Sequence, residues 1–324
     1  MTVLQLSGVD IEAIYSCIPK NSEDNLLRCA QIYGNTGKAL SVVRATGIKS
    51  RRVVDHRTSS LDLCSAAADK MFDDLSVSKD KIGAVVDVTF TPERTMPCNA
   101  CQAQRRLGLP KDLMAFDINL ACSGWAYGLS IAGMLAKSLG KKVLLLDGDT
   151  QTTYMEKSDA ATVPVMADAG TATLVAPSGD ATEAWKFSFL TDGSKGDTLT
   201  LPFGGTISMD GLGIFKFVTM DVLYFIRDFM AAENLTPEDL DAFVPHQANI
   251  FMIQQIAKKL KFSPEKLKIS GDVLGNSSSA TVPTTIAYTN ARGKLLISGF
   301  GGGLSASVGV IQVPESCKLK VVEL

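Results

Sequence analysis

The chain lacks the features that mark several common classes of protein. Its 324 residues contain only two histidines and no long apolar run. Apolar stretches such as 143–146 are far shorter than the 18 or so residues that cross a bilayer, so we predict no membrane span. The seven cysteines are an odd count without the spacing of a disulfide framework. No basic region precedes the first apolar residues, and we therefore expect no secretory signal and a cytoplasmic protein.

An excess of charge of one sign is also missing. The 32 lysines and arginines nearly balance the 34 aspartates and glutamates, which leaves a formal net charge of −2. A protein that binds nucleic acid by neutralising phosphates would be basic, so this balance argues against one. Hydrophobic residues make up 46% of the chain, whose length suits about two domains. We expect a folded protein with a large core.

Ligands for a metal ion are scarce as well. Cys98 and Cys101 form the only C-x-x-C pair, and a zinc site would need two more ligands. The two histidines are His56, which lies among charged residues typical of a surface, and His246. We therefore interpret the cysteine pair as structural and predict no metal site.

Strand and helix patterns alternate along the first half of the chain, which predicts an α/β fold. Ser59 and Ser60 begin a helix that extends to residue 75, and its apolar residues recur at helical spacing. Strands are predicted at 82–88, 114–120 and 142–146, with a helix over 123–139. Strand–helix–strand units with short connections indicate parallel strands.

The second half repeats this pattern. A long helix is predicted over 212–232 and another after His246, and strands at 295–300 and 306–313. Thr236-Pro237-Glu238 and Ser263-Pro264-Glu265 each have the residues of a helix start. A shift to small polar residues at 176–182 is the expected boundary, which divides the chain into halves 1–178 and 179–324.

Three residues from distant segments stand out as candidates for chemistry. Cys122 follows a predicted strand and precedes a helix, where the helix dipole favours a thiolate. His246 follows a strand that ends at Pro245, and Asn276 lies in a run of small polar residues. Singly, each has a common structural explanation: a packed thiol, a core histidine and a turn asparagine. Together, a nucleophile and two N–H donors suit the chemistry of thioesters. Backbone N–H groups of the glycines 301 to 303 could supply an oxyanion hole.

At these residues the sequence resembles the β-ketoacyl-acyl carrier protein synthase III family of the thiolase-like superfamily. Five segments carry the resemblance in order: RATGI at 44–48 with Arg51 and Arg52, AFDINLACSG at 115–124, VPHQAN at 244–249, GNSSS at 275–279 and GFGGG at 299–303. The resemblance implies a thiolase-like αβαβα sandwich of two similar halves and a homodimer. It also implies that an acyl-CoA or an acyl carrier protein thioester is the substrate, with no cofactor.

Roles for individual residues follow from this resemblance. Cys122 would carry the acyl group, while His246 and Asn276 would stabilise the enolate formed when a malonyl thioester loses CO₂. Backbone N–H groups of Cys122 and Gly302, flanked by Gly301 and Gly303, would form the oxyanion hole. Met96 stands where the family places a residue that reaches the acyl pocket of the partner subunit. The exposed cations expected to dock an acyl carrier protein are Lys216, Lys258 and Lys259.

Several positions depart from the family pattern. A tryptophan and an arginine that hold the adenine end of coenzyme A correspond here to Ser41 and Ala45. A pantetheine-binding asparagine corresponds to Leu212, a docking arginine to Phe251, and the segment 201–211 is short. The segment 315–324 extends past the usual end of the family. These departures predict a specialised pathway rather than housekeeping initiation from acetyl-CoA. An alternative is transfer of the acyl group from Cys122 to an oxygen or nitrogen of a small molecule.

Overall fold

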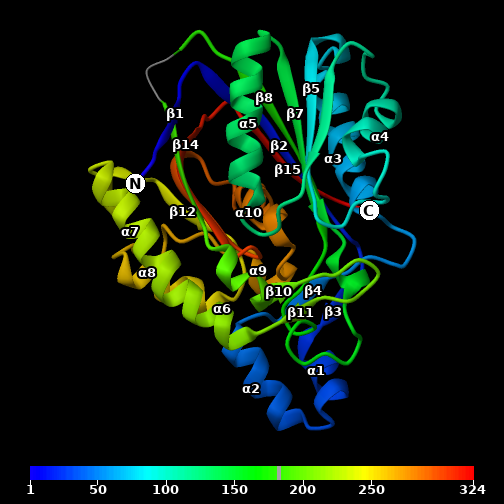
Figure 1. Ribbon diagram of the computed structural model, residues 1–324, viewed down its shortest axis with the longest axis vertical. Coiled ribbons are helices and arrows are strands. Elements are labelled where there is room, and N and C mark those ends of the chain that lie inside the picture. Colours follow the sequence, from blue (N-terminus) through cyan, green and yellow to red (C-terminus); the bar gives the residue numbers. More distant parts are fainter. Residues whose placement is uncertain (181–183) are drawn as a thin grey trace.

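The strands form two large sheets in the computed structural model, which describes residues 1–180 and 184–324 (Figure 1). The six-stranded sheet has the order β15 (Lys318–Glu323), β2 (Val9–Ile18), β8 (Ala169–Pro177), β7 (Lys142–Asp149), β5 (Ile82–Val88) and β6 (Met114–Ile118). The five-stranded sheet has the order β1 (Leu4–Leu6), β9 (Trp185–Thr191), β14 (Ser305–Val313), β13 (Gly293–Gly301) and β12 (Ala242–Pro245).

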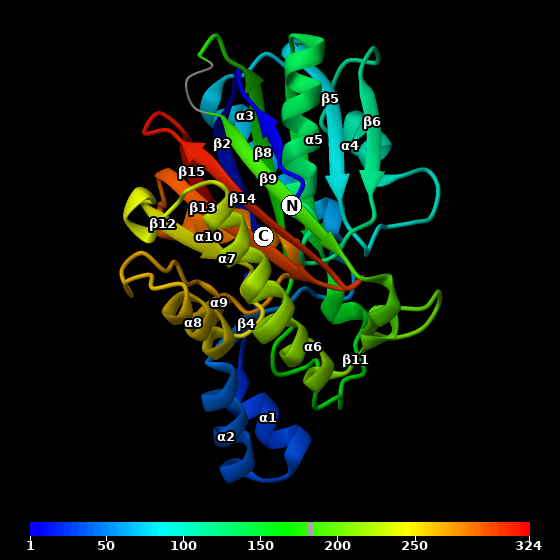
Figure 2. The same ribbon diagram turned by 60° about the vertical axis from the view of Figure 1, so that its left-hand side comes forward.

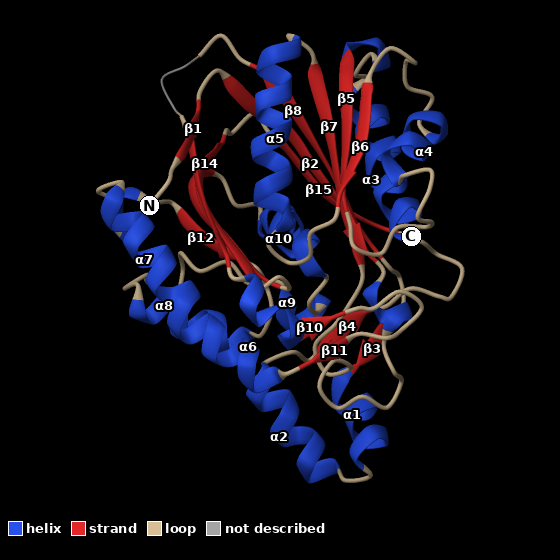
Figure 3. Cartoon of the chain, in the orientation of Figure 1, coloured by secondary structure: helices blue, strands red, loops and turns tan. Residues whose placement is uncertain are grey.

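Two helices lie between the sheets, α5 (Gly124–Leu139) and α10 (Thr281–Thr289), as Figure 3 shows. Helix α5 is nearly apolar, and its Trp125 and Leu129 pack with strand residues of both sheets. A helix that is apolar on most sides is stable only when most of it is buried, as α5 is between the sheets; Met134 and Leu139, near its C-terminal end, are exposed. Helices α3 (Ser60–Leu75) and α4 (Asn99–Arg106) cover the outer face of the six-stranded sheet.

The outer face of the five-stranded sheet is covered by α6 (Gly211–Phe217), α7 (Leu223–Ala232) and α8 (Ile250–Lys259) (Figure 2). The α6 and α7 helices join without a break through the π-helical turn Val218–Val222, as the predicted helix over 212–232 requires. The succession helix, sheet, helix, sheet, helix confirms the predicted αβαβα sandwich.

Each sheet takes an edge strand from the other end of the chain. Strand β1 pairs antiparallel with β9, and β15 pairs in parallel with β2. The segment 315–324 therefore forms the edge of the six-stranded sheet, and its Lys320 binds Asp74 of α3 at 2.6 Å. Residue 178 falls between β8 and β9, where the chain passes from one sheet to the other. The division into separate halves stays a prediction, because the two sheets exchange strands.

Several predicted elements have the predicted bounds. Helix α3 begins after Ser59, which forms a capping box with Asp62, and strand β5 occupies 82–88. All seven residues of β5 are buried, which explains why its pattern is apolar apart from Asp87. Strand β7 is three residues longer than predicted, because Asp147 and Asp149 continue it as buried acidic residues.

Two predicted helices do not form. Thr236 does cap a turn, but it is a single 3-10 turn, Pro237–Asp239, after which the chain enters the buried strand β12. Ser263-Pro264-Glu265 begins only a turn, because Leu267 forms a β-bridge with Phe243 of that strand. In both places the hydrogen bonds that the chain forms in or beside strand β12 outweigh the local preference of the sequence for a helix.

Smaller elements extend one end of the molecule. Helices α1 (Asn25–Tyr33) and α2 (Thr36–Thr46) project together in both Figure 1 and Figure 2. Near them lie the two-stranded sheets β3 (Ser22–Asp24) with β4 (Ser50–Arg52) and β10 (Leu199–Thr200) with β11 (Ser208–Met209), and the short helix α9 (Gly271–Leu274). No helix within 1–180 or 184–324 is long and apolar enough to cross a membrane.

Candidate active site

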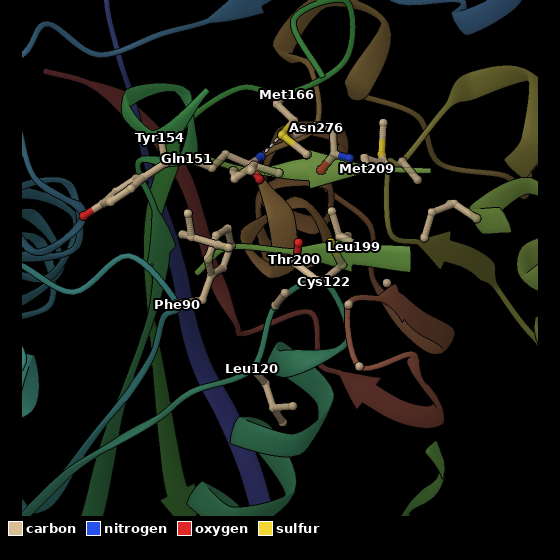
Figure 4. A pocket seen from close by; sticks show the side chains of 18 of the residues that line it. Phe90, Leu120, Cys122, Gln151, Tyr154, Met166, Leu199, Thr200, Met209 and Asn276 are labelled. Carbon is tan, nitrogen blue, oxygen red and sulfur yellow. Dashed lines mark hydrogen bonds between the residues drawn. The ribbon is translucent and has the colours of Figure 1, made fainter. Parts of the chain in front are cut away.

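A single cavity of about 870 Å³ contains all three residues proposed for the chemistry. Cys122 enters it from the loop before α5, His246 from the end of β12, and Asn276 from the loop after α9. Apolar side chains line much of the remaining wall, and Figure 4 shows Cys122 among several of them. Three segments, of which the first and last are 154 positions apart in sequence, thus contribute to one cavity.

Cys122 lies just before α5, as predicted, and glycines of β13 allow it to pack there. A Cβ on Gly299 would lie 2.6 Å from the carbonyl oxygen of Cys122. A Cβ on Gly301 would lie 2.9 Å from the Cys122 sulfur, closer than real Cβ atoms approach a neighbour. Only glycine leaves this space open. The Cys122 residue therefore packs directly against the backbone at the end of β13.

Burial opposes the thiolate that the helix position favours. Burial, with smaller contributions from the carboxyls of Asp149 and Asp147, raises the pKa of the Cys122 thiol to about 12. The Ser278 hydroxyl, 3.9 Å from the sulfur, acts in the opposite direction. Burial therefore outweighs the helix position that favours a thiolate, and Cys122 rests as a thiol.

His246 is buried and neutral. Burial lowers the pKa of its imidazole to about 3. Its Nδ1 lies 2.7 Å from Thr281 Oγ1, and its ring meets the Phe300 ring edge-on at 5.3 Å between centroids. The backbone N–H of His246 donates to Ser298 of β13, which continues the pairing of β12 beyond Pro245. Strand pairing and ring packing together hold the imidazole in one orientation.

Asn276 is held by backbone contacts on one side and a side-chain contact on the other. Its N–H donates to Val165, and its carbonyl accepts from Ala167 and from Gln151 Nε2, 2.5 Å away (Figure 4). Its side-chain Oδ1 accepts from the backbone N–H of Ser278 at 2.9 Å. Because the oxygen is engaged, the amide Nδ2 is the group left to donate.

Ser278 connects the three candidates, and sequence reasoning missed it. Its N–H orients Asn276, its hydroxyl contacts Cys122, and its carbonyl accepts from the Thr281 hydroxyl that meets His246. It is fully buried and has φ of 59°, which is uncommon for a residue other than glycine. The serine run of the GNSSS segment has the composition of an ordinary turn. The only feature of the sequence that could have indicated a role for Ser278 is its position two residues after Asn276.

Buried aspartates behind Cys122 were also missed. Asp149 Oδ1 accepts hydrogen bonds from Thr89 Oγ1, from Phe90 N and from Thr91. Burial raises the pKa of Asp149 to about 7, although a hydrogen bond from Ser278 lowers it. Asp147 and Asp87 are buried on the neighbouring strands, and burial raises the pKa of both carboxyls well above the ordinary value.

The other predicted site residues lie at or near the cavity. Gly301, Gly302 and Gly303 all line it, beside Cys122. Met96 does not line it; this side chain is 84% exposed, next to lining residues Glu93 to Thr95. Lys216 is exposed on α6, and Lys258 and Lys259 are exposed at the end of α8.

Exposed apolar side chains lie on the elements that line the cavity or next to its lining residues. Phe203 lines the cavity and is fully exposed. Leu212, Phe215 and Phe251, each beside a lining residue of α6 or α8, are also exposed. We call these four residues the cavity mouth, and Cys122, His246, Asn276, Ser278 and Thr281 the cavity floor. Two of the four, Leu212 and Phe251, are departures that the sequence had marked.

Sites for a metal ion are absent from the part of the chain that the structure describes, where no three histidine, cysteine or acidic side chains gather suitably. Cys98 and Cys101 are free thiols whose sulfurs lie 3.4 Å apart at the start of α4. The prediction that no cofactor is needed stays a prediction.

Comparison with known proteins adds independent information. Residues 116–193 match the family model described as 3-oxoacyl-[acyl-carrier-protein (ACP)] synthase III, and residues 230–313 match its C-terminal model. Among curated proteins, the chain is 33% identical over 278 residues to beta-ketoacyl-[acyl-carrier-protein] synthase III 1 of Vibrio parahaemolyticus. That alignment covers 82% of this chain and 87% of the relative.

Two further similarities cover as much or more. The beta-ketoacyl-[acyl-carrier-protein] synthase III of Nitratidesulfovibrio vulgaris is 31% identical over 297 residues, or 84% of this chain and 89% of that one. A crystal structure of a 3-oxoacyl-(acyl-carrier protein) synthase from Burkholderia xenovorans LB400 superposes with a TM-score of 0.94 at 29% identity. It covers 100% of this chain and 99% of its own, so the likeness includes both sheets and the segment 315–324.

Proposed function

Because the chain belongs to the 3-oxoacyl-[acyl-carrier-protein] synthase III family, we propose that it condenses an acyl thioester with a malonyl thioester. In the first half-reaction the Cys122 sulfur attacks the acyl carbon, and the donor leaves as a thiol. In the second, a malonyl thioester loses CO₂, and its enolate carbon attacks the acyl group on Cys122. The products are a β-ketoacyl thioester and a free cysteine.

The cavity floor supports this proposal. Both half-reactions place negative charge on an oxygen, so each needs hydrogen-bond donors set before the charge develops. Asn276 Nδ2 and the His246 ring are proposed to meet the enolate oxygen. Backbone N–H groups of Cys122 and Gly302 are proposed to meet the oxygen of the acyl group. The single observation that carries the proposal is that Ser278 contacts Cys122 and Asn276 directly and His246 through Thr281.

An acyl carrier protein is the partner that the family name implies, and we propose the exposed Lys216, Lys258 and Lys259 as its docking cations. Such a patch suits an acidic partner, mainly by steering its approach. The apolar cavity mouth supports a specialised acyl donor rather than acetyl-CoA, since Leu212 and Phe251 offer no polar grip. The cytoplasmic location expected from the sequence stays a prediction.

A homodimer is the proposed assembly. Strand β6 is the outer strand of its sheet, and Met96 stands 84% exposed in the loop that follows β5. In a dimer that extends the sheet at β6, Met96 would reach the acyl pocket of the partner copy, as the family resemblance implies. Sedimentation of the protein with and without a β6 proline substitution, Phe116→Pro, would measure this assembly.

The roles of the three residues can be separated by mass spectrometry. Cys122→Ala is expected to take up no acyl group from acyl-CoA or acyl carrier protein donors. His246→Ala and Asn276→Ala are expected to be acylated on Cys122 but to release little CO₂ from malonyl carrier protein. Cys101→Ala, which removes an exposed thiol away from the cavity, serves as the matched control.

Product analysis completes this test. A β-ketoacyl thioester identifies condensation, whereas an ester or amide of an added alcohol or amine would identify the alternative acyl transfer. Wild-type condensation rates in both His246→Ala and Asn276→Ala would contradict the assigned roles.

A further inference from the structure

Gln151 places a polar side chain on a wall of the cavity that is otherwise largely apolar. The residue begins the 3-10 turn Gln151–Tyr154 that follows β7, and it is only 2% exposed. Phe90, Tyr154 and Met166 line the same cavity and belong to one hydrophobic cluster. A buried amide in such surroundings is costly unless each of its polar atoms has a partner. The partners of the Gln151 amide therefore decide what this wall can bind.

Two hydrogen bonds fix the orientation of the Gln151 amide. Its Nε2 donates to the backbone carbonyl of Ala167 at 3.0 Å and to that of Asn276 at 2.5 Å. Backbone carbonyls only accept, so the amide nitrogen and not the oxygen must face them. Figure 4 shows the nitrogen at the bond toward Asn276 and the oxygen turned away from it. Both amide hydrogens are thus engaged, and the side chain cannot turn over.

The amide oxygen is left without a partner. Among the residues that the structure describes, none donates a hydrogen bond to Gln151 Oε1. This oxygen is not one of the unpaired atoms that are sealed in the interior, as both carboxyl oxygens of Asp87 are. It therefore keeps accessible surface, and the space beside this buried residue is the cavity that it lines. An acceptor with free lone pairs faces the place of the substrate.

Gln151 lies beside the cavity floor rather than at the cavity mouth. The carbonyl that it binds belongs to Asn276, which Ser278 orients, and Ser278 also contacts Cys122. An acyl chain that enters this part of the cavity displaces water from it. An alkyl group beside Oε1 would leave the oxygen unpaired, whereas a group that donates a hydrogen would replace the water. Few polar groups on an apolar wall typically fix the orientation and identity of a ligand.

We propose that Gln151 Oε1 selects an acyl donor whose chain carries a hydroxyl group, which donates its hydrogen to this oxygen. The inference rests on the proposed function and deepens it by naming a substrate class. A ketone or carboxylate at this place would only accept, so it would oppose the amide oxygen. An ammonium group would need a counter-charge, and an amide would bring a carbonyl that needs its own donor. A hydroxyl satisfies Gln151 without either requirement.

Matched pairs of acyl thioesters test the inference on the wild-type protein. The two members of a pair differ only by a hydroxyl or a methyl group at one carbon, and successive pairs move this carbon along the chain. Each is presented on coenzyme A and on an acyl carrier protein, and mass spectrometry follows acylation of Cys122 with time. We expect the hydroxyl member of at least one pair to load about tenfold faster or more.

The outcomes separate this inference from the function on which it rests. Equal loading of both members in every pair would overturn the selection by Gln151 but leave acyl transfer to Cys122 standing. Acylation by none of the donors would contradict the proposed function and the inference together.

A substitution at Gln151 ties the preference to this side chain. Gln151→Met keeps the length and removes Oε1 together with the bond to Asn276. A disturbed cavity floor affects both members of a pair alike, so their ratio isolates the lost oxygen. We expect the hydroxyl preference to disappear in Gln151→Met and to persist in Met209→Leu, the matched change in an apolar part of the wall. An unchanged ratio in Gln151→Met would contradict the assigned role, and the wild-type pairs decide the inference if this variant does not fold.

Discussion

The cavity floor and the cavity mouth are built by opposite means. On the floor every named side chain is buried, and Ser278 and Thr281 join the others by hydrogen bonds. At the mouth the side chains are apolar and exposed, for example Leu212 at 63% and Phe251 at 47%. A buried polar network tolerates few changes, because each lost partner leaves another group unpaired. An exposed apolar rim can change with the substrate while the fold is unaffected.

This difference explains which parts of the family pattern are present. The segments that form the floor, around Cys122, His246 and Asn276, match the family, whereas two of the departures, Leu212 and Phe251, belong to the mouth. Condensation requires the residues of the cavity floor to keep their type and position. The residues of the cavity mouth can differ according to the acyl donor that the enzyme uses. We therefore expect substitutions on the floor to affect stability and the rates of chemistry, and substitutions at the mouth to affect donor affinity alone.

The largest effect is expected directly behind the floor, at Asp149. Its carboxyl has a folded pKa of about 7 against an ordinary value of 3.8, so the folded state binds the proton more tightly than the unfolded one. The contribution of Asp149 to stability is therefore greatest below pH 4 and declines as the pH rises toward 7. The decline attributable to this group is at most about 4 kcal/mol.

Asp149→Asn should remove this decline, because an amide does not titrate and its oxygen can still accept from Thr89 and Phe90. Urea unfolding at pH 5 and pH 8 measures the difference between wild type and variant at each pH. Asp10→Asn, which changes an exposed carboxyl on β2, is the control. The same pH dependence of the free energy of unfolding in wild type and Asp149→Asn would contradict the prediction, because it would show that ionisation of the buried carboxyl does not destabilise the folded state.

A second effect is expected where β13 touches the nucleophile. Gly301→Ala places a methyl group 2.9 Å from the Cys122 sulfur, so strand or thiol must shift. We expect acyl loading to fall about 100-fold, as for other small displacements of a reacting group. Gly302→Ala is the matched variant, since its Cβ would meet its nearest neighbour only at 3.7 Å. Equal losses in both variants would show that the close approach of Gly301 is not the cause.

Much of this molecule could be predicted from its sequence. The buried strand β5 and helix α3 have their predicted bounds, because local pattern and tertiary packing agree there. The helix starts at Thr236 and Ser263 failed where a neighbouring strand claimed the chain. Local signals cannot show such pairing, which depends on residues distant in sequence.

The site divides in the same way. Residue type marked Cys122 and His246, because a thiol at a helix start and a rare imidazole are chemically conspicuous. Ser278 and Thr281 were missed, since a serine or threonine in a polar run is ordinary until its partners are known. The raised pKa of Cys122 could not be predicted either, because it depends mainly on burial and then on two aspartates of β7. Contacts across the fold decide such properties.

The smallest effect is expected at the docking cations beyond the mouth. Lys258→Glu with Lys259→Glu reverses two exposed charges at the end of α8. Such charges act mainly on the rate of encounter, so we expect KM for a carrier-bound donor to rise several-fold and kcat to stay unchanged. A small pantetheine thioester with the same acyl group should be used equally well by the variant and the wild type. Lys318→Glu, exposed on β15 far along the chain, is the control. High salt should reduce the difference in KM between the variant and the wild type, because exposed charges are screened. A lower kcat of the variant with the small thioester would instead show that these lysines affect the chemistry at the cavity floor, and it would contradict the separate roles of the two regions.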